Sequence, residues 1–166
     1  DGNGYVDDCH GIDTYYDDAD PMDDNLVSHG THMAGIIGAV GQNGVGVAGV
    51  NWQVSLVSCK FLSRFGLGPT SGAVACLEYV KALKDRGVNI VATNNSWGGG
   101  DFSQALHDAI DAHRQRNMLF IAAAGNDNID HTLEPRYPAD TDLPNVIAVA
   151  ASTDFGNLSL FSDYGK

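Results

Sequence analysis

Two histidines three residues apart, His29 and His32, are the side chains of this sequence best suited to proton-transfer chemistry. They belong to the run Ser-His-Gly-Thr-His-Met-Ala-Gly at 28–35, whose small residues predict the start of a closely packed helix. An imidazole titrates near neutral pH, so a rigidly held one can take a proton from a nucleophile and return it to a leaving group. The same spacing also suits a helix cap or a metal-binding pair, so this run alone leaves three roles open.

Two further runs favour the catalytic role. Residues 121–127 read Ile-Ala-Ala-Ala-Gly-Asn-Asp, an apolar strand that leads into Gly-Asn, and residues 91–99 read Val-Ala-Thr-Asn-Asn-Ser-Trp-Gly-Gly. Together with the histidine run, and in this order, they resemble the subtilisin-like serine proteases, or subtilases. The resemblance covers most of the chain. It implies that His29 is the general base and that the side chain of Asn126 donates a hydrogen bond to the oxyanion.

The resemblance also implies a binding groove for a polypeptide substrate. Two walls would enclose the side chain that precedes the scissile bond, and an extended substrate would pair with a third backbone segment. Small residues on both walls leave space for a large apolar side chain, which Trp97 narrows, although glycine and alanine also suit close strand packing. The wall residues are Ser96, Trp97, Gly98, Ala123, Ala124 and Gly125, and the pairing segment is Gly66, Leu67 and Gly68.

Two short runs imitate the remaining motifs of a serine protease triad. Ile-Asp-Thr at 12–14 imitates the apolar-Asp-(Ser/Thr)-Gly motif, but Tyr15 replaces the glycine and His29 follows too closely, so we interpret this run as the next strand. Pro-Thr-Ser-Gly at 69–72 imitates the nucleophile motif, but Pro69 replaces a glycine and Asn126 comes later in the chain. We interpret Thr70-Ser71 as a helix N-cap. The expectation is therefore a partial catalytic domain, without the triad aspartate and serine and inactive by itself.

Two segments are candidate calcium sites. The run Asp-Gly-Asn-Gly-Tyr-Val-Asp-Asp at 1–8 places oxygen ligands at alternate positions, but it lacks a complete EF-hand pattern, and an acidic solvated loop is the alternative. The run Gly-Gln-Asn-Gly-Val-Gly-Val at 41–47 resembles the high-affinity calcium loop of subtilases. The candidate ligands are Asp1, Asn3, Tyr5 and Asp8 in the first segment and Gly41, Asn43, Val45 and Val47 in the second.

The composition argues against some classes of binding partner and bears on the cellular compartment. Nine basic and 21 acidic residues give a formal charge of −12, which argues against nucleic acid and against anionic membrane surfaces. No apolar run approaches the roughly 20 residues that span a bilayer. The three cysteines, Cys9, Cys59 and Cys76, have no metal-ligand spacing, and an odd number leaves at least one without a partner in the chain. We interpret Cys59 and Cys76 as buried side chains, whose redox state the sequence leaves open, and the family resemblance implies secretion.

The periodicity of apolar residues predicts alternating strands and helices. Because the strands are nearly continuous in apolar residues, the pattern predicts one domain over residues 1–166, a three-layer α/β/α partial subtilisin-like fold with a mainly parallel sheet. His107 and His113 are interpreted as surface or packing residues, and the resemblance implies a cis bond before Pro138. The expected strands are 11–16, 54–62, 88–93, 118–124, 145–151 and 158–164, and the expected helices are 29–39, 70–87 and 103–116.

In subtilases the strand that carries the triad aspartate lies between the strands that match 54–62 and 88–93. Two unpaired strand edges inside a molecule are costly, so we expect a homodimer in which a strand from a second copy fills the gap. Direct pairing of the two strands is the alternative. For function, the first hypothesis is part of a serine endopeptidase, and the alternative is a non-catalytic binding or scaffold protein with the same fold.

Overall fold

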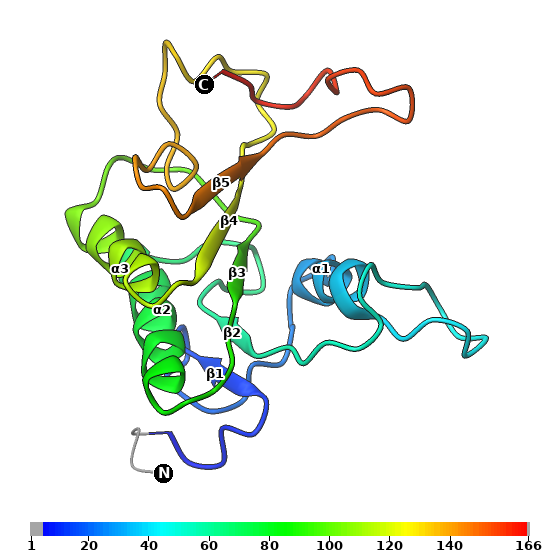
Figure 1. The fold of residues 1–166 in the computed structure, drawn as a ribbon, viewed down its shortest axis with the longest axis vertical. Helices are drawn as coiled ribbons and strands as arrows, with labels where there is room; N and C mark the ends of the chain where they lie inside the picture. Colours follow the sequence, from blue (N-terminus) through cyan, green and yellow to red (C-terminus); the bar gives the residue numbers. More distant parts are fainter. Residues whose placement is uncertain (1–4, 166) are drawn as a thin grey trace. The chain divides into compact units, whose positions relative to one another are not determined.

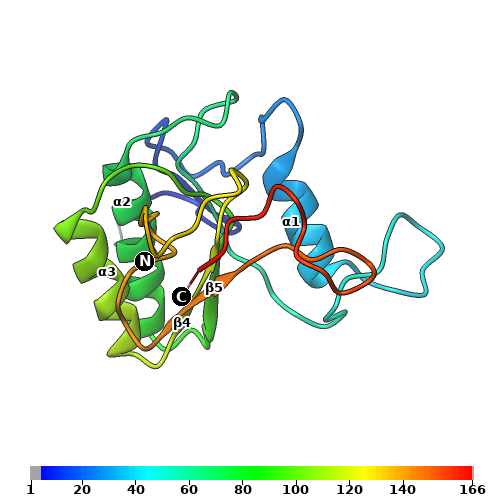
Figure 2. The same ribbon diagram turned by 90° about the horizontal axis from the view of Figure 1, so that it is seen from above.

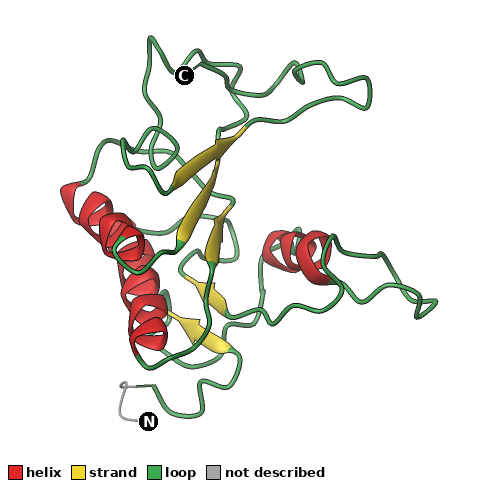
Figure 3. Cartoon of the chain, in the orientation of Figure 1, coloured by secondary structure: helices red, strands yellow, loops and turns green. Residues whose placement is uncertain are grey.

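The computed structural model describes residues 5–165, which divide into two compact units between Cys76 and Leu77. Figure 1 labels the elements in chain order and Figure 3 distinguishes helices from strands. Within the described residues, no helix is both long and apolar enough to cross a membrane. The elements are β1 Gly11–Asp13, α1 His29–Gly38, β2 Ser58–Lys60, α2 Thr70–Asp85, β3 Ala92–Asn95, α3 Gln104–Arg114, β4 Leu119–Ala123 and β5 Val146–Val149.

The first unit contains a parallel pair of short strands, β1 and β2, with Ile12 opposite Cys59. Gly11 has a φ of 131°, and a Cβ there would lie 1.7 Å from the Ser58 carbonyl oxygen, so only glycine permits this close approach. At the other end of the pair, the Asp13 carboxylate accepts a hydrogen bond from the Lys60 ammonium. Both ends of this two-stranded sheet are therefore determined by specific residues.

Helix α1 begins at His29 and ends at Gly38, as the run of small residues predicted. None of its residues is buried within the structure. After the helix, the chain turns back past the C-terminal end of α1, where the Gly49 N–H donates a hydrogen bond to the Ala39 carbonyl at 2.8 Å. A Cβ on Gly49 would lie 2.4 Å from the Ala39 nitrogen, so glycine lets the two segments meet.

The second unit is built on the parallel sheet β3-β4-β5. Helix α3 packs against β4, and it lies beside the sheet together with the C-terminal part of α2 (Figure 2). Its buried side consists of Leu106, Ala109, Ile110 and His113. In β4 the side chains alternate, with Phe120 and Ala122 buried and Leu119 exposed. The α/β class with parallel strands is thus confirmed.

Two predictions about the strands were wrong. The strand expected over 54–62 is confined to 58–60, because Val54 and Leu56 are exposed and have no strand partner beside them among the described residues. No strand forms over 158–164, where the chain turns and Leu160 is exposed. The strands fall into two sheets, and among the described residues β2 and β3 are not neighbours in either, so the direct pairing considered as the alternative does not occur.

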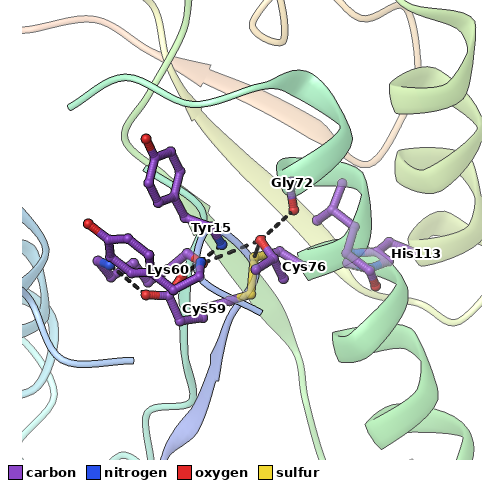
Figure 4. Close-up of a disulfide and its surroundings, with 10 residues drawn as sticks. Tyr15, Cys59, Lys60, Gly72, Cys76 and His113 are labelled. Atoms are coloured by element: carbon purple, nitrogen blue, oxygen red, sulfur yellow. Dashed lines mark hydrogen bonds and ion pairs between the residues drawn. A yellow bond between two sulfur atoms is a disulfide. The ribbon is translucent and has the colours of Figure 1, made fainter. Parts of the chain in front are cut away.

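The structure decides the redox state of Cys59 and Cys76, which the sequence left open. The two sulfurs form a disulfide that joins β2 to α2, with Cα atoms 5.7 Å apart (Figure 4). Thr14 stands beside it and donates from Oγ1 to the Gly72 carbonyl at 3.0 Å. Cys9 is the exposed free cysteine. The parallel pairing of β1 with β2 and the docking of α2 bring the two sulfurs together, which sequence spacing could not reveal.

Candidate functional site

His29 is the first residue of α1, and its side chain is exposed. The preceding residue, Ser28, adopts a left-handed conformation with φ 50° and makes no side-chain capping bond. The carboxylate of Asp23 takes that role instead, because its Oδ2 accepts hydrogen bonds at 2.7 Å from both the N–H and the hydroxyl of Thr31. An anion near the N-terminus of a helix is favoured by the helix dipole. Asp23 therefore helps to hold the turn that carries His29, and sequence reasoning missed this residue.

The pKa of Asp23 lies below its ordinary value. Burial alone would raise it, but the hydrogen bonds from Thr31 and from the Asn25 N–H, together with nearby His29, outweigh burial. The carboxylate is therefore ionised at neutral pH and anchors the turn that carries the histidine. Its position six residues before His29, in the run Asp-Asp-Asn, was the available sequence signal, since Asp and Asn favour such turns.

The two predicted pocket walls both lie in the second unit. Residues 96–98 follow β3, and residues 124 and 125 follow β4. These strands are parallel neighbours with Asn95 opposite Ala122, so both segments leave the same edge of the sheet. Ligands of open α/β sheets bind at such carboxyl ends. Asn126 comes directly after the second wall and is exposed.

The first wall is held from behind by the turn at Tyr137. The N–H of Gly99 donates to the Tyr137 carbonyl at 3.1 Å, and the ring of Phe102 meets the Tyr137 ring edge-on at 5.4 Å between centroids. The Tyr137–Pro138 peptide bond is cis, as predicted. The segment after β3 is thus braced by a buried turn rather than left free.

The second wall and Asn126 are held by the segment 161–164. The N–H of Asp163 donates to the Gly125 carbonyl at 3.1 Å, and its Oδ1 accepts from the N–H groups of Asp127 and Ile129 at 2.8 and 3.0 Å. A Cβ on Gly125 would lie 2.1 Å from Asp163 Oδ2, so glycine is required where the carboxylate comes closest. Sequence reasoning took this segment as part of a strand over 158–164 and missed Asp163.

The predicted pairing segment, Gly66 to Gly68, lies in the first unit. It forms a turn in which the Ser63 N–H donates to the Leu67 carbonyl at 2.8 Å and the Gly66 N–H donates to the Ser63 carbonyl at 2.9 Å. Leu67 is exposed, whereas a Cβ on Gly68 would lie 2.1 Å from the Phe61 carbonyl oxygen. His29 and this segment belong to one unit, and the two pocket walls and Asn126 belong to the other.

The structure describes some, but not all, of the predicted calcium ligands. Asp1 and Asn3 lie outside the described residues, and no group of three or more His, Cys, Asp or Glu among the described residues could hold a metal. In the loop 41–47, Asn43 Oδ1 accepts the Val45 N–H at 3.0 Å, which leaves one lone pair for a cation. Calcium takes six to eight oxygens, so this loop can supply only part of a shell.

Asp13 and Ser71, the two imitations of triad residues, are used differently. The Asp13 carboxylate is buried and accepts hydrogen bonds from the N–H groups of Tyr15 and Tyr16 as well as from Lys60. Ser71 lies in the first turn of α2 and is exposed. Within the described residues, no hydrogen bond joins it to His29. Both positions accord with the interpretation as a strand and a helix start.

A comparison with protein families decides the membership of this chain. The model described as the subtilase family, Peptidase_S8, matches residues 2–166. The chain belongs to the subtilase family. Among curated subtilases, it is 34% identical over 163 residues to "Subtilisin-like protease 1" of Plasmodium vivax, covering 90% of this chain and 25% of the relative. It is 34% identical over 155 residues to "Thermophilic serine proteinase" of Bacillus sp. (strain AK1), covering 93% and 36%.

Solved structures of subtilases carry the same fold. A cold adapted subtilisin-like serine proteinase superposes with a TM-score of 0.79 at 34% identity, covering 94% of this chain and 51% of that one. A protease from Pseudoalteromonas arctica PAMC 21717 gives a TM-score of 0.79 at 28% identity, covering 98% and 57%. The fold is therefore a partial α/β subtilisin fold. The chain spans about a quarter to a third of the length of these curated subtilases and about half of the solved ones.

Proposed function

We propose that this chain is part of a subtilisin-like serine endopeptidase that hydrolyses polypeptides through an acyl-enzyme. His29 acts as the general base that takes the proton of a serine nucleophile and returns it to the leaving amine. Asn126 donates its side-chain amide to the oxyanion of the tetrahedral intermediate. The observation that carries the proposal is the junction of two neighbouring parallel strands, where both pocket walls and Asn126 leave the same sheet edge.

The serine and the orienting aspartate are proposed to lie outside residues 1–166. Ser71 and Asp13 are the nearest imitations of these residues in the sequence, and their surroundings are those of a helix start and a buried ion pair. Residues 1–166 alone are therefore expected to release no product from a peptide substrate above background. Turnover by this polypeptide that disappears in Ser71→Ala would refute that expectation.

The proposal is tested on the intact protein that contains this chain, with a chromogenic peptide and a fluorophosphonate that labels activated serines. His29→Ala should abolish both turnover and labelling, because no base remains to activate the serine. Asn126→Ala should lower kcat by about 10²–10³, the magnitude known from subtilisin, with KM little changed. His10→Ala and Asn157→Ala are matched controls, since each removes the same type of side chain from an exposed position.

The alternative is a non-catalytic binding or scaffold protein. It predicts that the intact protein binds extended peptides without cleaving them and that the fluorophosphonate labels no residue. Binding that persists unchanged in His29→Ala, in the absence of hydrolysis by the wild type, would favour the scaffold and refute the protease.

We also propose that the protein is secreted. The Cys59–Cys76 disulfide supports this compartment, because disulfides form and persist in oxidising surroundings. Mass spectrometry of the native protein, alkylated without reduction, should find both of these cysteines unmodified and Cys9 alkylated. Alkylation of all three cysteines in freshly isolated protein would argue for a reducing compartment.

A further inference from the structure

We propose that Asp163 is a positioning residue of the oxyanion hole, holding the loop that carries Asn126 in its active geometry. The inference rests on the proposed function of Asn126. It concerns residues of the second unit alone, where the backbone on both sides of Asn126 is tied to one segment of the chain.

Asp163 makes hydrogen bonds to the backbone on both sides of Asn126 in the chain. On its N-terminal side, the Gly125 carbonyl accepts the Asp163 N–H at 3.1 Å. On its C-terminal side, Asp163 Oδ1 accepts the Asp127 N–H at 2.8 Å and the Ile129 N–H at 3.0 Å. A single residue, 37 positions away in the sequence, thus contacts the backbone immediately before and immediately after the proposed donor.

The carboxylate is well suited to this role because it is almost fully enclosed. Asp163 is 1% exposed, so its charge is offset by directed hydrogen bonds and not by water. Burial alone would raise the pKa of this carboxyl, but the two N–H donors and the neighbouring imidazole outweigh burial and hold the pKa below its ordinary value. An ionised carboxylate accepts stronger hydrogen bonds than a neutral group does.

Asp163 is itself held by a buried polar chain. Its Oδ2 lies 3.5 Å from His131 Nε2, and His131 Nδ1 lies 2.9 Å from Asp140 Oδ2. The same Asp140 oxygen accepts the Arg136 N–H at 2.6 Å, beside the Tyr137 turn that braces the first pocket wall. The network therefore runs from the loop of Asn126 to the turn behind the opposite wall.

The remaining contacts of the segment 161–164 agree with a clamp. The Asn128 N–H donates to the Phe161 carbonyl at 2.9 Å, and the Tyr164 N–H donates to the Ile129 carbonyl at 3.0 Å. Ser162 is fully buried and anchors the segment to the end of the sheet, since its Oγ accepts the Ala151 N–H at 2.9 Å. These backbone hydrogen bonds keep the segment in place, and the Asp163 side chain connects it to the loop that carries Asn126.

The consequence for catalysis is a matter of geometry. An oxyanion donor must lie within hydrogen-bond distance of an oxygen that moves as the carbonyl becomes tetrahedral, and a misplacement of about 1 Å can cost about 10²-fold in rate. Asn126 is exposed and follows a glycine with a φ of 134°, so its own loop provides little restraint. Asp163 supplies the restraint from outside.

The test is a double-mutant cycle on the intact protease, with kcat, KM and the affinity of a peptide aldehyde, whose hemiacetal oxygen occupies the oxyanion hole. Asp163→Ala should lower kcat by about 10- to 100-fold and weaken the aldehyde by a similar factor, with KM changed by less than about 2-fold. Asp163→Asn keeps an oxygen acceptor for both N–H groups and should retain kcat within about 3-fold. In an Asn126→Ala background, Asp163→Ala should cause no further loss.

The outcomes distinguish a failure of the inference about Asp163 from a failure of the proposed protease function. If the wild type hydrolyses peptides and Asn126→Ala is slow while Asp163→Ala is not, the inference alone is overturned. Equal and additive losses in both backgrounds would also overturn it, because Asp163 would then act elsewhere. If the wild type shows no hydrolysis, the proposed function fails and the inference fails with it.

A measurement on the wild type covers the case in which Asp163→Ala does not fold. The amide hydrogens of Asp127 and Ile129 should exchange as slowly as those of the sheet, although their loop is exposed. Exchange of these two amides at the rate of the exposed loop 153–157 would overturn the inference without any substitution.

Discussion

Replacing Asp13 distinguishes a structural carboxylate from a catalytic one. Its Oδ1 accepts the N–H groups of Tyr15 at 2.7 Å and Tyr16 at 3.0 Å, and Oδ2 accepts the Lys60 ammonium. Asp13→Ala would leave two amides without their side-chain acceptor and Lys60 with the more distant Asp24 carboxylate, 3.4 Å away, and the neighbouring tyrosine rings. Breaking a buried pair by removing one partner costs about 3–5 kcal/mol, so we expect a loss of that order in the free energy of unfolding.

Two further variants calibrate that magnitude. Asp13→Asn keeps an acceptor for both amides and loses only the charge that faces Lys60, so we expect about 1.5–3 kcal/mol, the range for hydrogen bonds to charged groups. Asp24→Ala removes a carboxylate from the same lysine, but Asp24 is 40% exposed in its side chain. Exposed ion pairs contribute about 0–1 kcal/mol, so this matched control should change stability by less than about 1 kcal/mol.

The assay combines urea denaturation of the intact protein with steady-state hydrolysis of a peptide below the unfolding transition. A structural Asp13 predicts a lowered denaturation midpoint in Asp13→Asn, with kcat/KM within about 3-fold of the wild type. An aspartate that orients the catalytic histidine would instead show a loss of about 10⁴ in kcat, the cost in serine proteases of the corresponding amide. That loss, with unchanged stability, would refute our assignment of Asp13 to the β1–β2 pair.

The remaining predictions concern pH, calcium and assembly. Burial holds the pKa of His113 below its ordinary value, so stability should fall as pH drops below about 6.5; His113→Gln should flatten that fall, and His107→Gln should not. We propose that calcium binds at the loop of Asn43. Millimolar calcium should then raise the Tm of the wild type above its value in excess chelator, and should raise the Tm of Asn43→Ala by less. Equal Tm values of the wild type in calcium and in chelator would refute the site. We propose that residues 1–166 dimerise through the open edges of β2 and β3, and a monomer by light scattering would refute this.

Elements that depend on local pattern agreed closely with prediction. Helix α3 buries the four residues that its 3.6-residue period selects, and Ser103 caps it by accepting the Leu106 N–H. The helix predicted to start at His29 forms over residues 29–38, which contain no proline, although three of them are glycines. Such signals lie within one or two turns of the chain, so a single sequence carries them.

Strand lengths were less accessible because a strand needs a partner. The apolar alternation near Val54 predicts a strand, yet pairing with β1 extends only over residues 58–60. The same holds for 158–164, where buried Ser162 and Asp163 bond to segments far away in sequence and no ladder forms. Period alone indicates which side chains seek burial, but it does not reveal where a neighbouring backbone begins or ends.

The sequence by itself determined the family, the parallel α/β class, the helix that carries His29 and the position of Asn126 after an apolar strand, because each is encoded in contiguous residue types. Only the tertiary structure decided that Cys59 bonds to Cys76, that Asp23 anchors the turn before His29, and that Asp163 grips the backbone around Asn126. These last contacts join residues 8 to 38 positions apart. They depend on burial and on a distance of a few ångströms between folded segments, and neither quantity is written in residue spacing.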